Sequence, residues 1–168
     1  MVLLSLTILK GSILGQTGSA VEVTAQPEKK CFVEGSDLSF RFSITNNSKQ
    51  QSISFSTCPS PYGVELSDSQ GRPVPQSDRY TQQVRNGDYV CESTGLIEIK
   101  PGETWGPQVW PTPDRGMFDL RAGTYTGRLL WHFTTYKRKS DGGVPESKHM
   151  RAITIKSTGF SVAVTPRP

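Results

Sequence analysis

Histidine is scarce in this sequence, with only His132 and His149 among 168 residues. Serine and cysteine hydrolases need a histidine that takes a proton from the nucleophile. Neither histidine has an aspartate or glutamate at a spacing that would orient it, so we expect no catalytic residues of this kind. A pair of carboxylates follows no spacing rule and stays open as an alternative, although short loops leave little room for a substrate cleft. We therefore expect a protein that is not an enzyme.

Motifs for metals and cofactors are missing as well. A structural zinc site needs four ligands at short spacings, and the sequence has neither a C-x-x-C pair nor two neighbouring histidines. There is also no glycine-rich phosphate loop and no dinucleotide-binding fingerprint. We expect no metal and no cofactor.

Cysteine is limited to three residues, Cys31, Cys58 and Cys91. Cys58 and Cys91 bracket a polar segment, and a disulfide between them in an oxidising compartment would stabilise the fold by roughly 3 to 4 kcal/mol. Spacing alone does not rank the three pairings. We expect the Cys58–Cys91 bridge, with Cys31 a buried thiol beside Phe32 in a predicted strand.

Long apolar runs are confined to the N-terminus. Residues 1–20 are mostly apolar, with the small residues Gly18 and Ala20 placed as at a signal-peptidase site. The run lacks a positive start and contains Lys10, so a disordered or strand-forming N-terminus on a cytoplasmic protein is the alternative. No other run approaches the length of a membrane span. We expect a secreted or periplasmic protein with a single domain at residues 21–168.

A dense basic surface is lacking too, because 19 basic and 15 acidic residues are spread along the chain and give a net charge of +4. Nucleic-acid binding usually needs a basic face with interleaved aromatic residues, so we expect no nucleic-acid partner. The hydrophobic content of 34%, with 16 Gly and 12 Pro, is ordinary for strands that show one face to water. We expect a soluble monomer.

What the sequence does contain is alternation with a period of two, clearest at residues 120–136. One side of this predicted strand carries Tyr125, Leu129, Trp131 and Phe133. The other side carries Thr126, Arg128, His132 and Thr134. A turn at Ala122 and Gly123 followed by a tyrosine is typical of strand F of an immunoglobulin-like sandwich, where the tyrosine hydroxyl bonds back to the corner. Gly127 stands where antibody-type domains have a cysteine.

Further strands are predicted in the N-terminal half. Residues 21–25 and 31–33 have the pattern of an edge strand that Pro27 interrupts. Residues 37–45 alternate cleanly, and we expect them to form a hairpin with residues 51–57 across a turn at 46–48. The side chains expected in the core are Leu38, Phe40, Phe42, Ile44, Ile53 and Phe55. A short edge strand follows, with Tyr62, Val64 and Leu66 inward.

The C-terminal half begins with a long polar segment that holds at most one weak strand, at residues 81–84. Residues 96–99 are predicted as strand E, ended by Pro101-Gly102. In residues 151–164 the apolar positions change parity, so we expect either a β-bulge at 157–159 or two short strands. Together these patterns predict an all-β fold, a single immunoglobulin-like β-sandwich of about seven to eight antiparallel strands.

Trp105 and Trp110 lie among prolines and a glycine in residues 104–113. Two interpretations are open for these tryptophans. They cap the open end of the core, or they present an exposed aromatic surface to a ligand.

The loop after the predicted strand F is the most distinctive in the chain. It begins with an aromatic residue and three positive charges, at Tyr136, Lys137, Arg138 and Lys139. Gly142-Gly143 gives it a hairpin-type turn. Loops at the ends of a sandwich carry variable chemistry, so this one is a candidate site for an acidic protein surface. The alternative is a solvated loop that is basic for solubility.

Five motifs in order carry a resemblance to a known family: ITNNS, ISFST, PYGVELSDSQGRPV, KPGET and AGTY. Over residues 37–133 the chain resembles the immunoglobulin-like domain of the BsuPI type, named for an intracellular proteinase inhibitor of Bacillus. The resemblance implies an immunoglobulin-like fold and a proteinase as partner, bound through a surface loop. The predicted signal peptide, Cys58 and Cys91 depart from an intracellular inhibitor. We expect a non-catalytic binding or structural module, with proteinase inhibition as the alternative.

Overall fold

The computed structural model describes residues 20–57, 62–86, 95–111 and 117–168, with the backbone alone at 83–84 and 110–111. These residues form ten strands, one α-helix and one 3₁₀ turn. In chain order they are β1 (Val21–Pro27), β2 (Cys31–Val33), β3 (Ser39–Asn46), β4 (Ser52–Ser56), β5 (Tyr62–Ser67), α1 (Asp78–Asn86), β6 (Leu96–Ile99), β7 (Thr104–Pro111), β8 (Gly123–Tyr136), η1 (Ser147–His149), β9 (Arg151–Lys156) and β10 (Phe160–Thr165).

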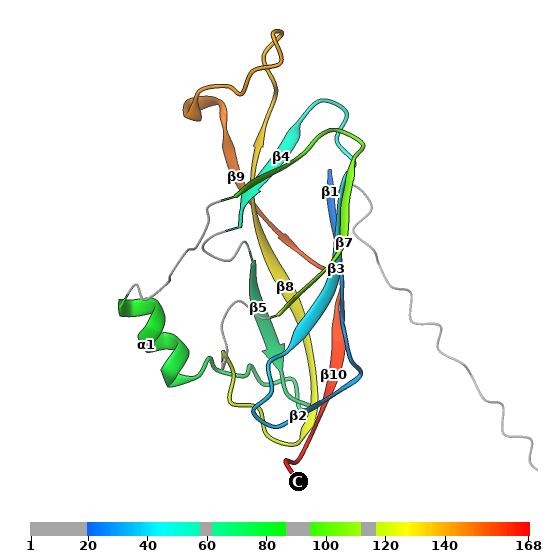
Figure 1. Ribbon diagram of the computed structural model, residues 1–168, viewed down its shortest axis with the longest axis vertical. Coiled ribbons are helices and arrows are strands. Elements are labelled where there is room, and N and C mark those ends of the chain that lie inside the picture. The colour runs from blue at the N-terminus through cyan, green and yellow to red at the C-terminus, as the bar shows by residue number, and fades with distance from the viewer. Residues whose placement is uncertain (1–19, 58–61, 87–94, 112–116) are drawn as a thin grey trace, which may run out of the picture.

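The strands form two sheets, so the predicted all-β class is confirmed. The smaller sheet has the order β1-β3-β7, and the larger has the order β2-β10-β8-β4-β6 with β5 and β9 also paired to β8. The 14-residue strand β8 is the axis of the larger sheet (Figure 1). Its one edge pairs with β9 and β10 in turn, and its other edge pairs with β4 and β5. The long strand predicted at residues 120–136 therefore organises the fold.

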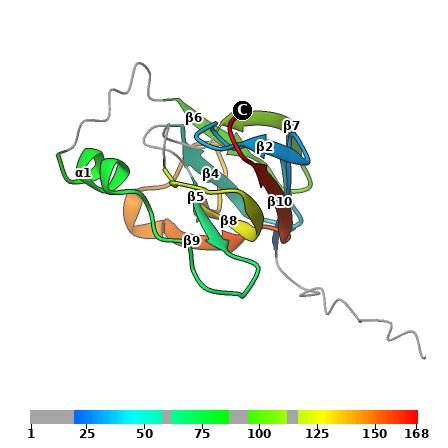
Figure 2. The ribbon, with the colours of Figure 1, turned by 90° about the horizontal axis from the view of Figure 1, so that it is seen from below.

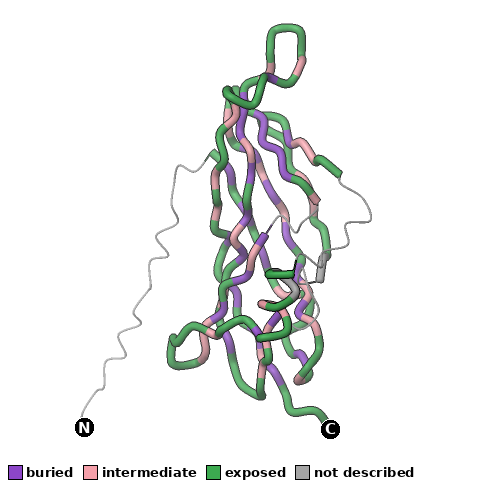
Figure 3. The backbone as a smooth tube through the Cα atoms, turned by 90° about the vertical axis from the view of Figure 1, so that its left-hand side faces the viewer, coloured by how far each residue is buried: buried purple, intermediate pink, exposed green. Residues whose placement is uncertain are grey.

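An aromatic core joins the two sheets. Trp131 on β8 is completely buried, and its ring centroid lies 4.7 Å from that of Phe42 on β3, in the opposite sheet. The rings of Phe55 and Tyr62 pack on the same tryptophan at 5.2 and 4.9 Å. Figure 3 shows buried residues running along both sheets over most of the length of the molecule. The side chains expected inward in residues 37–66 and 120–136 are buried: Leu38, Phe40, Phe42, Ile44, Ile53, Phe55, Tyr62, Val64, Leu66, Tyr125, Leu129, Trp131 and Phe133.

The predicted corner at Tyr125 is present. The Tyr125 hydroxyl donates a hydrogen bond of 2.9 Å to the carbonyl oxygen of Arg121, four residues earlier. Two residues further along β8, a Cβ on Gly127 would lie 2.4 Å from the Glu65 carbonyl oxygen and 2.6 Å from the Leu66 side chain. Glycine stands at this inward position because neighbouring strands approach too closely for any side chain.

The extra residue predicted at 157–159 is present, and it forms a bulge between two short strands, β9 and β10, which both pair with β8. Across it, the pairing of β8 shifts from Leu130 with Lys156 to Gly127 with Phe160, so two residues of β8 face three. The extra residue returns the apolar side chains to the core. Thr158 uses the bulge to reach the other sheet, because its backbone N–H donates to Val23 and its hydroxyl accepts from the Ala25 N–H. The bulge thus ties β1 to the edge of the larger sheet.

The predicted hairpin between residues 37–45 and 51–57 is wrong. These residues form β3 and β4, which lie in different sheets. The turn between them is exposed and leads from one sheet to the other, and the fully buried Asn46 holds its start. The Asn46 Nδ2 atom donates to the carbonyl oxygens of Gln51 at 2.8 Å and Ile99 at 3.0 Å. A buried amide that satisfies two backbone carbonyls favours this crossover over a tight hairpin.

The prediction for strand E needs a correction. In an immunoglobulin sandwich strand E lies beside strand B. Residues 96–99 do form a strand, β6, but it pairs with β4 in the larger sheet. The partner of β3 is instead β7, which contains Trp105 and Trp110. Its prolines and a glycine hid this strand from pattern analysis.

The weak strand predicted at residues 81–84 is wrong, since these residues lie in the helix α1. Ser77 begins the helix by accepting a hydrogen bond from the Tyr80 N–H on its side chain and another from the Thr81 N–H on its carbonyl. Asp78 in the first turn and Arg85 in the last suit the helix dipole. Figure 2, a view from below, shows α1 standing to one side of the sheets and β2 lying beside β10.

Candidate functional site

The structure gathers the most distinctive exposed chemistry at one end of the molecule. The connection between β8 and β9, residues 137–150, projects beyond both sheets there (Figure 1). Its tip is a tight turn, in which the Gly142 N–H donates to the Lys139 carbonyl and the Lys139 N–H donates to the Gly143 carbonyl, both at 2.9 Å. Gly142 has a φ of 80°, which a residue with a side chain rarely adopts.

The four residues predicted to begin this loop have different roles. Lys137 and Lys139 are exposed, as a binding surface requires. Tyr136 is only 3% exposed, so its ring is not presented to a partner. Arg138 folds back onto the protein and bonds to Glu98 and to the Gly142 carbonyl oxygen. The loop therefore offers two free lysines rather than the predicted aromatic and three positive charges.

Glu98 on β6 anchors the base of the loop. The Arg138 Nε atom donates to Glu98 Oε1 at 2.8 Å, and the Arg138 Nη2 atom donates to Glu98 Oε2. The hydroxyls of Ser52 and Tyr136 bond to the same carboxylate. The Arg138 hydrogen bond, more than any other interaction, holds the pKa of Glu98 below its usual range. Burial, followed by the hydrogen bond with Glu98, raises the pKa of Tyr136.

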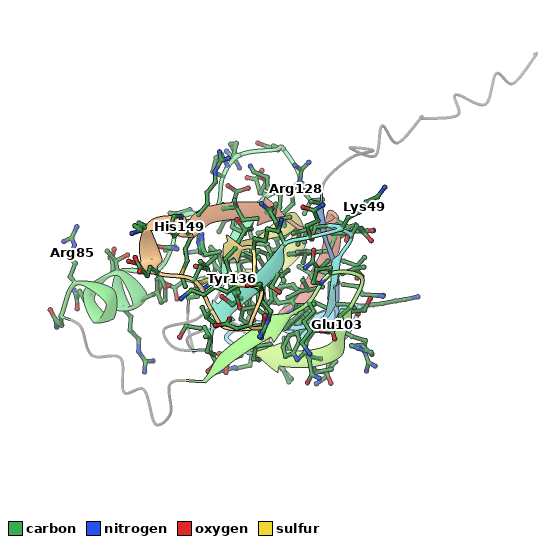
Figure 4. All side chains as sticks on the ribbon, turned by 90° about the horizontal axis from the view of Figure 1, so that it is seen from above. Lys49, Arg85, Glu103, Arg128, Tyr136 and His149 are labelled. Carbon is green, nitrogen blue, oxygen red and sulfur yellow. The ribbon has the colours of Figure 1, made fainter. Side chains whose placement is uncertain are left out.

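A groove opens beside this loop, between the two sheets. Its volume is about 480 Å³. The floor is apolar and comes from both sheets, and the rim is basic. The lining side chains that matter here are Val21, Ile53, Ile153, Ile155, Lys137, His149 and Arg151. In Figure 4, which looks onto this end, Tyr136 lies near the middle of the end face, with His149 on one side and Lys49 and Glu103 on the other.

The two tryptophans are both in β7. Trp105 is half-buried and packs on the core, with its ring centroid 5.7 Å from Phe42 and 5.2 Å from Phe55. This contact fits the first interpretation, in which the tryptophans cap the core. The backbone of Trp110 pairs with Phe40, and its side chain lies outside the described residues.

The described residues hold little that resembles a catalytic or metal centre. His132 is exposed on the outer face of β8, where its Nδ1 lies 3.1 Å from the Thr154 hydroxyl. His149 is exposed in η1. No three histidine, cysteine, aspartate or glutamate side chains in the described ranges are arranged to hold a metal ion. The polar cluster with the most hydrogen bonds described above is the partly exposed group around Glu98, and its members hold a loop.

The remaining predictions fall partly outside the described residues. Cys58 and Cys91 both lie there, so their pairing stays a prediction, as does the signal peptide in residues 1–20, of which only Ala20 is described. Cys31 is an exposed free thiol, which corrects the expectation that it is buried. The short strand β2 runs parallel to β10 at the edge of its sheet, and this position leaves the Cys31 side chain in solvent.

The groove was missed by the sequence analysis. A signal was available, because Ile153 and Ile155 fall on one face of the strand predicted from residue 151 onward, and Arg151 shares their parity. No pattern in the sequence showed that the described part of the opposite sheet would cover this face only partly. Among the described residues, no helix is long and apolar enough to cross a membrane. Compared with protein-family models and with curated proteins, the sequence matches none.

Proposed function

We propose that this protein is a non-catalytic, exported binding module with an immunoglobulin-like sandwich fold, which engages a protein partner through the β8–β9 connection. The observation that carries the proposal is that the base of this connection is held in place by hydrogen bonds. Arg138 bonds through two nitrogens to Glu98 on a neighbouring strand, so the exposed lysines stand on a fixed support. A loop that is already ordered loses less conformational entropy when it binds.

Two features support the immunoglobulin-like part of the proposal. The Tyr125 hydroxyl bonds to the Arg121 carbonyl at the corner before β8, as in strand F of such domains. The N-terminal segment also contributes to both sheets, because β1 pairs with β3 whereas β2 pairs with β10. The resemblance to the BsuPI type rests on the sequence motifs alone.

The expected partner has an acidic surface. Lys137 and Lys139 are exposed and lie at the same end of the molecule as His149 and Arg151. The side chains of His149 and Arg151 are exposed as well. Exposed charges of one sign speed the association with a surface of the opposite sign and set its salt dependence. Arg138 is excluded from this contact because its guanidinium is held by Glu98.

The proposal is tested by affinity capture from an extract of the source organism, followed by binding kinetics. The variant Lys137→Glu with Lys139→Glu should slow association with the captured partner at least about tenfold and remove most of its salt dependence. The control is Lys29→Glu with Lys30→Glu, which makes the same charge change in the β1–β2 connection at the other end of the molecule. Equal association by both variants would reject the β8–β9 connection as the site.

The same experiment separates the alternative, proteinase inhibition. A proteinase with an acidic specificity pocket could bind an exposed lysine on a projecting loop that is anchored at its base. If the captured partner is a proteinase, adding the unaltered protein should lower its proteolytic activity. Adding the Lys137→Glu, Lys139→Glu variant instead should leave that activity unchanged. A captured partner without proteolytic activity would remove this alternative and leave the binding module.

A further inference from the structure

The groove beside the β8–β9 connection is built by a mismatch between two edge strands. β1 is hydrogen-bonded to the larger sheet at the bulge, where Thr158 bonds to Val23 and Ala25. β9 continues from the bulge for a further six residues, past the point at Val21 where β1 begins. The described part of the smaller sheet therefore covers only part of the inner face of β9, with Val21 at its border.

The part of the inner face of β9 that the described residues leave open is apolar. Ile153 pairs with Phe133 and Ile155 pairs with Trp131, and both partners on β8 are buried in the core. Residues directly opposite each other in a sheet share a face, so Ile153 and Ile155 also point inward. Both are nevertheless only half-buried. Core-facing isoleucines that remain half-exposed form a hydrophobic floor that another chain can cover.

β9 also offers a backbone edge. It pairs with β8 along one side, and no strand in the described ranges pairs with its other side. An unpaired edge next to an apolar groove is the arrangement that binds an extended peptide, because backbone hydrogen bonds and alternate side-chain contacts are made together. A compact apolar molecule would use the floor but not the edge.

The charged residues at the rim of the groove indicate which charge a bound chain should carry. Arg151 lies at the open end of β9 on the same face as the isoleucines, and Lys137 and His149 lie beside it. All three side chains are exposed, and none of the residues lining the groove is an aspartate or a glutamate. The complementary chain therefore carries acidic residues where it leaves the apolar floor.

We propose that this groove binds an extended segment of a partner protein, which adds to the free edge of β9, places alternate apolar side chains on Ile153 and Ile155, and directs acidic residues toward Lys137 and Arg151. This proposal deepens the proposed function, on which it rests, by naming the chemistry of the partner. The β8–β9 connection then forms one wall of the site.

The test uses a fluorescein-labelled peptide in which two glutamates adjoin a run of alternating valine and threonine. Two versions are made, with the glutamates at the N-terminal or at the C-terminal end of the run, and each is titrated with the full chain at pH 7.5. We expect one direction to bind saturably, as measured by fluorescence anisotropy. The same peptide with lysines in place of the glutamates should bind at least about tenfold more weakly. Equal binding of the acidic and basic peptides would overturn the proposal.

Three variants assign the site. Ile153→Thr with Ile155→Thr should weaken binding at least about tenfold, because the apolar floor is lost. Lys137→Gln with Arg151→Gln should weaken it at least about fivefold at low salt and by less at high salt. Lys49→Gln with Lys100→Gln removes the same charge from exposed residues outside both the groove and the β8–β9 connection, and should stay within about twofold. Loss of binding in this control, or none in the first two variants, would overturn the proposal.

A measurement on the unaltered protein does not depend on how the variants fold. Bound peptide should slow amide hydrogen exchange at alternate residues of β9, since an added strand pairs with every second residue of an edge. Saturable binding without this protection would reject strand addition. Contacts in nuclear magnetic resonance spectra between the Ile153 or Ile155 methyl groups and residues 1–19, or concentration-dependent dimers, would show another occupant and likewise overturn the proposal.

The two proposals fail separately. A partner whose capture depends on Lys137 and Lys139, but not on Ile153 and Ile155, would leave the proposed function standing and reject the groove. Peptide binding that depends on Ile153 and Ile155, together with equal partner association by the Lys137→Glu, Lys139→Glu variant and its control, would leave the groove standing and reject the proposed function.

Discussion

Tyr125 and Trp131 lie six residues apart on β8 and stabilise the protein in different ways. The Tyr125 hydroxyl makes one hydrogen bond at a corner, whereas Trp131 contacts aromatic rings from both sheets. Tyr125→Phe should lower the free energy of unfolding by about 1 kcal/mol, the net value of one hydrogen bond. Trp131→Ala should lower it by roughly 3 to 5 kcal/mol, because a large cavity opens in the core.

Urea unfolding of both variants, followed by far-ultraviolet circular dichroism, measures the difference. The two substitutions differ in whether they remove a polar bond or core volume, so each controls for the other. Small and equal effects would mean that the contacts around Trp131 contribute little to stability.

Strand β6 and the β8–β9 connection are coupled through Glu98 and Arg138. The Arg138 hydrogen bond lowers the pKa of Glu98 in the folded protein. A carboxylate with a depressed folded-state pKa contributes stability above its unfolded-state pKa, and that stability is lost as the pH falls through the folded-state value. Glu98→Gln should therefore destabilise the protein near pH 7, and the difference from the parent should shrink as the pH falls below about 4.5.

Urea unfolding at pH 7, 5 and 3 tests this coupling. Glu22→Gln on the exposed face of β1 is the control, and it should stay within about 0.5 kcal/mol of the parent. A difference between Glu98→Gln and the parent that is constant across the three pH values would show that the carboxylate charge does not hold the loop.

At the scale of the whole molecule, two described residues near Cys58 and Cys91 in sequence, Thr57 and Gly95, are hydrogen-bonded to each other. The Thr57 N–H donates to the Gly95 carbonyl at 2.9 Å, and the Gly95 N–H donates to the Thr57 hydroxyl at 3.0 Å. Cys58 follows Thr57 directly, and Cys91 precedes Gly95 by four residues, a span of at most about 14 Å. Chain length alone therefore permits the predicted Cys58–Cys91 disulfide, although both residues lie outside the described ranges.

Protein purified from an oxidising compartment should contain this bridge, and its reduction should lower the free energy of unfolding by roughly 3 to 4 kcal/mol. Peptide mapping without reductant is the measurement. Two free thiols, or a bridge from Cys31 to either residue, would contradict the assignment and weaken the case for export.

The sequence predicted local structure well where the pattern depends on neighbouring residues alone. The Gly-Thr-Tyr corner, the alternation along β8 and the extra residue at 157–159 each follow from the two-residue period of a strand. It also predicted which side chains are inward. It failed at α1, where Ser77 and Asp78 were a helix-start signal that the polar composition of the segment obscured.

For the candidate site, the sequence located the basic loop but not the state of its residues. Whether Tyr136 is exposed and whether Arg138 is free depend on Glu98, 40 residues away in sequence, and no spacing rule joins them. The groove depends on where β1 begins relative to β9.

The sequence by itself determined the class of fold and the face of each strand, because side-chain alternation is a local property of an extended backbone. Only the tertiary structure decided which strands are neighbours, as in the crossover at Asn46 and the placement of β6 and β7. Strand pairing depends on long-range contacts and on the satisfaction of buried polar groups, and neither is encoded within a short window of residues.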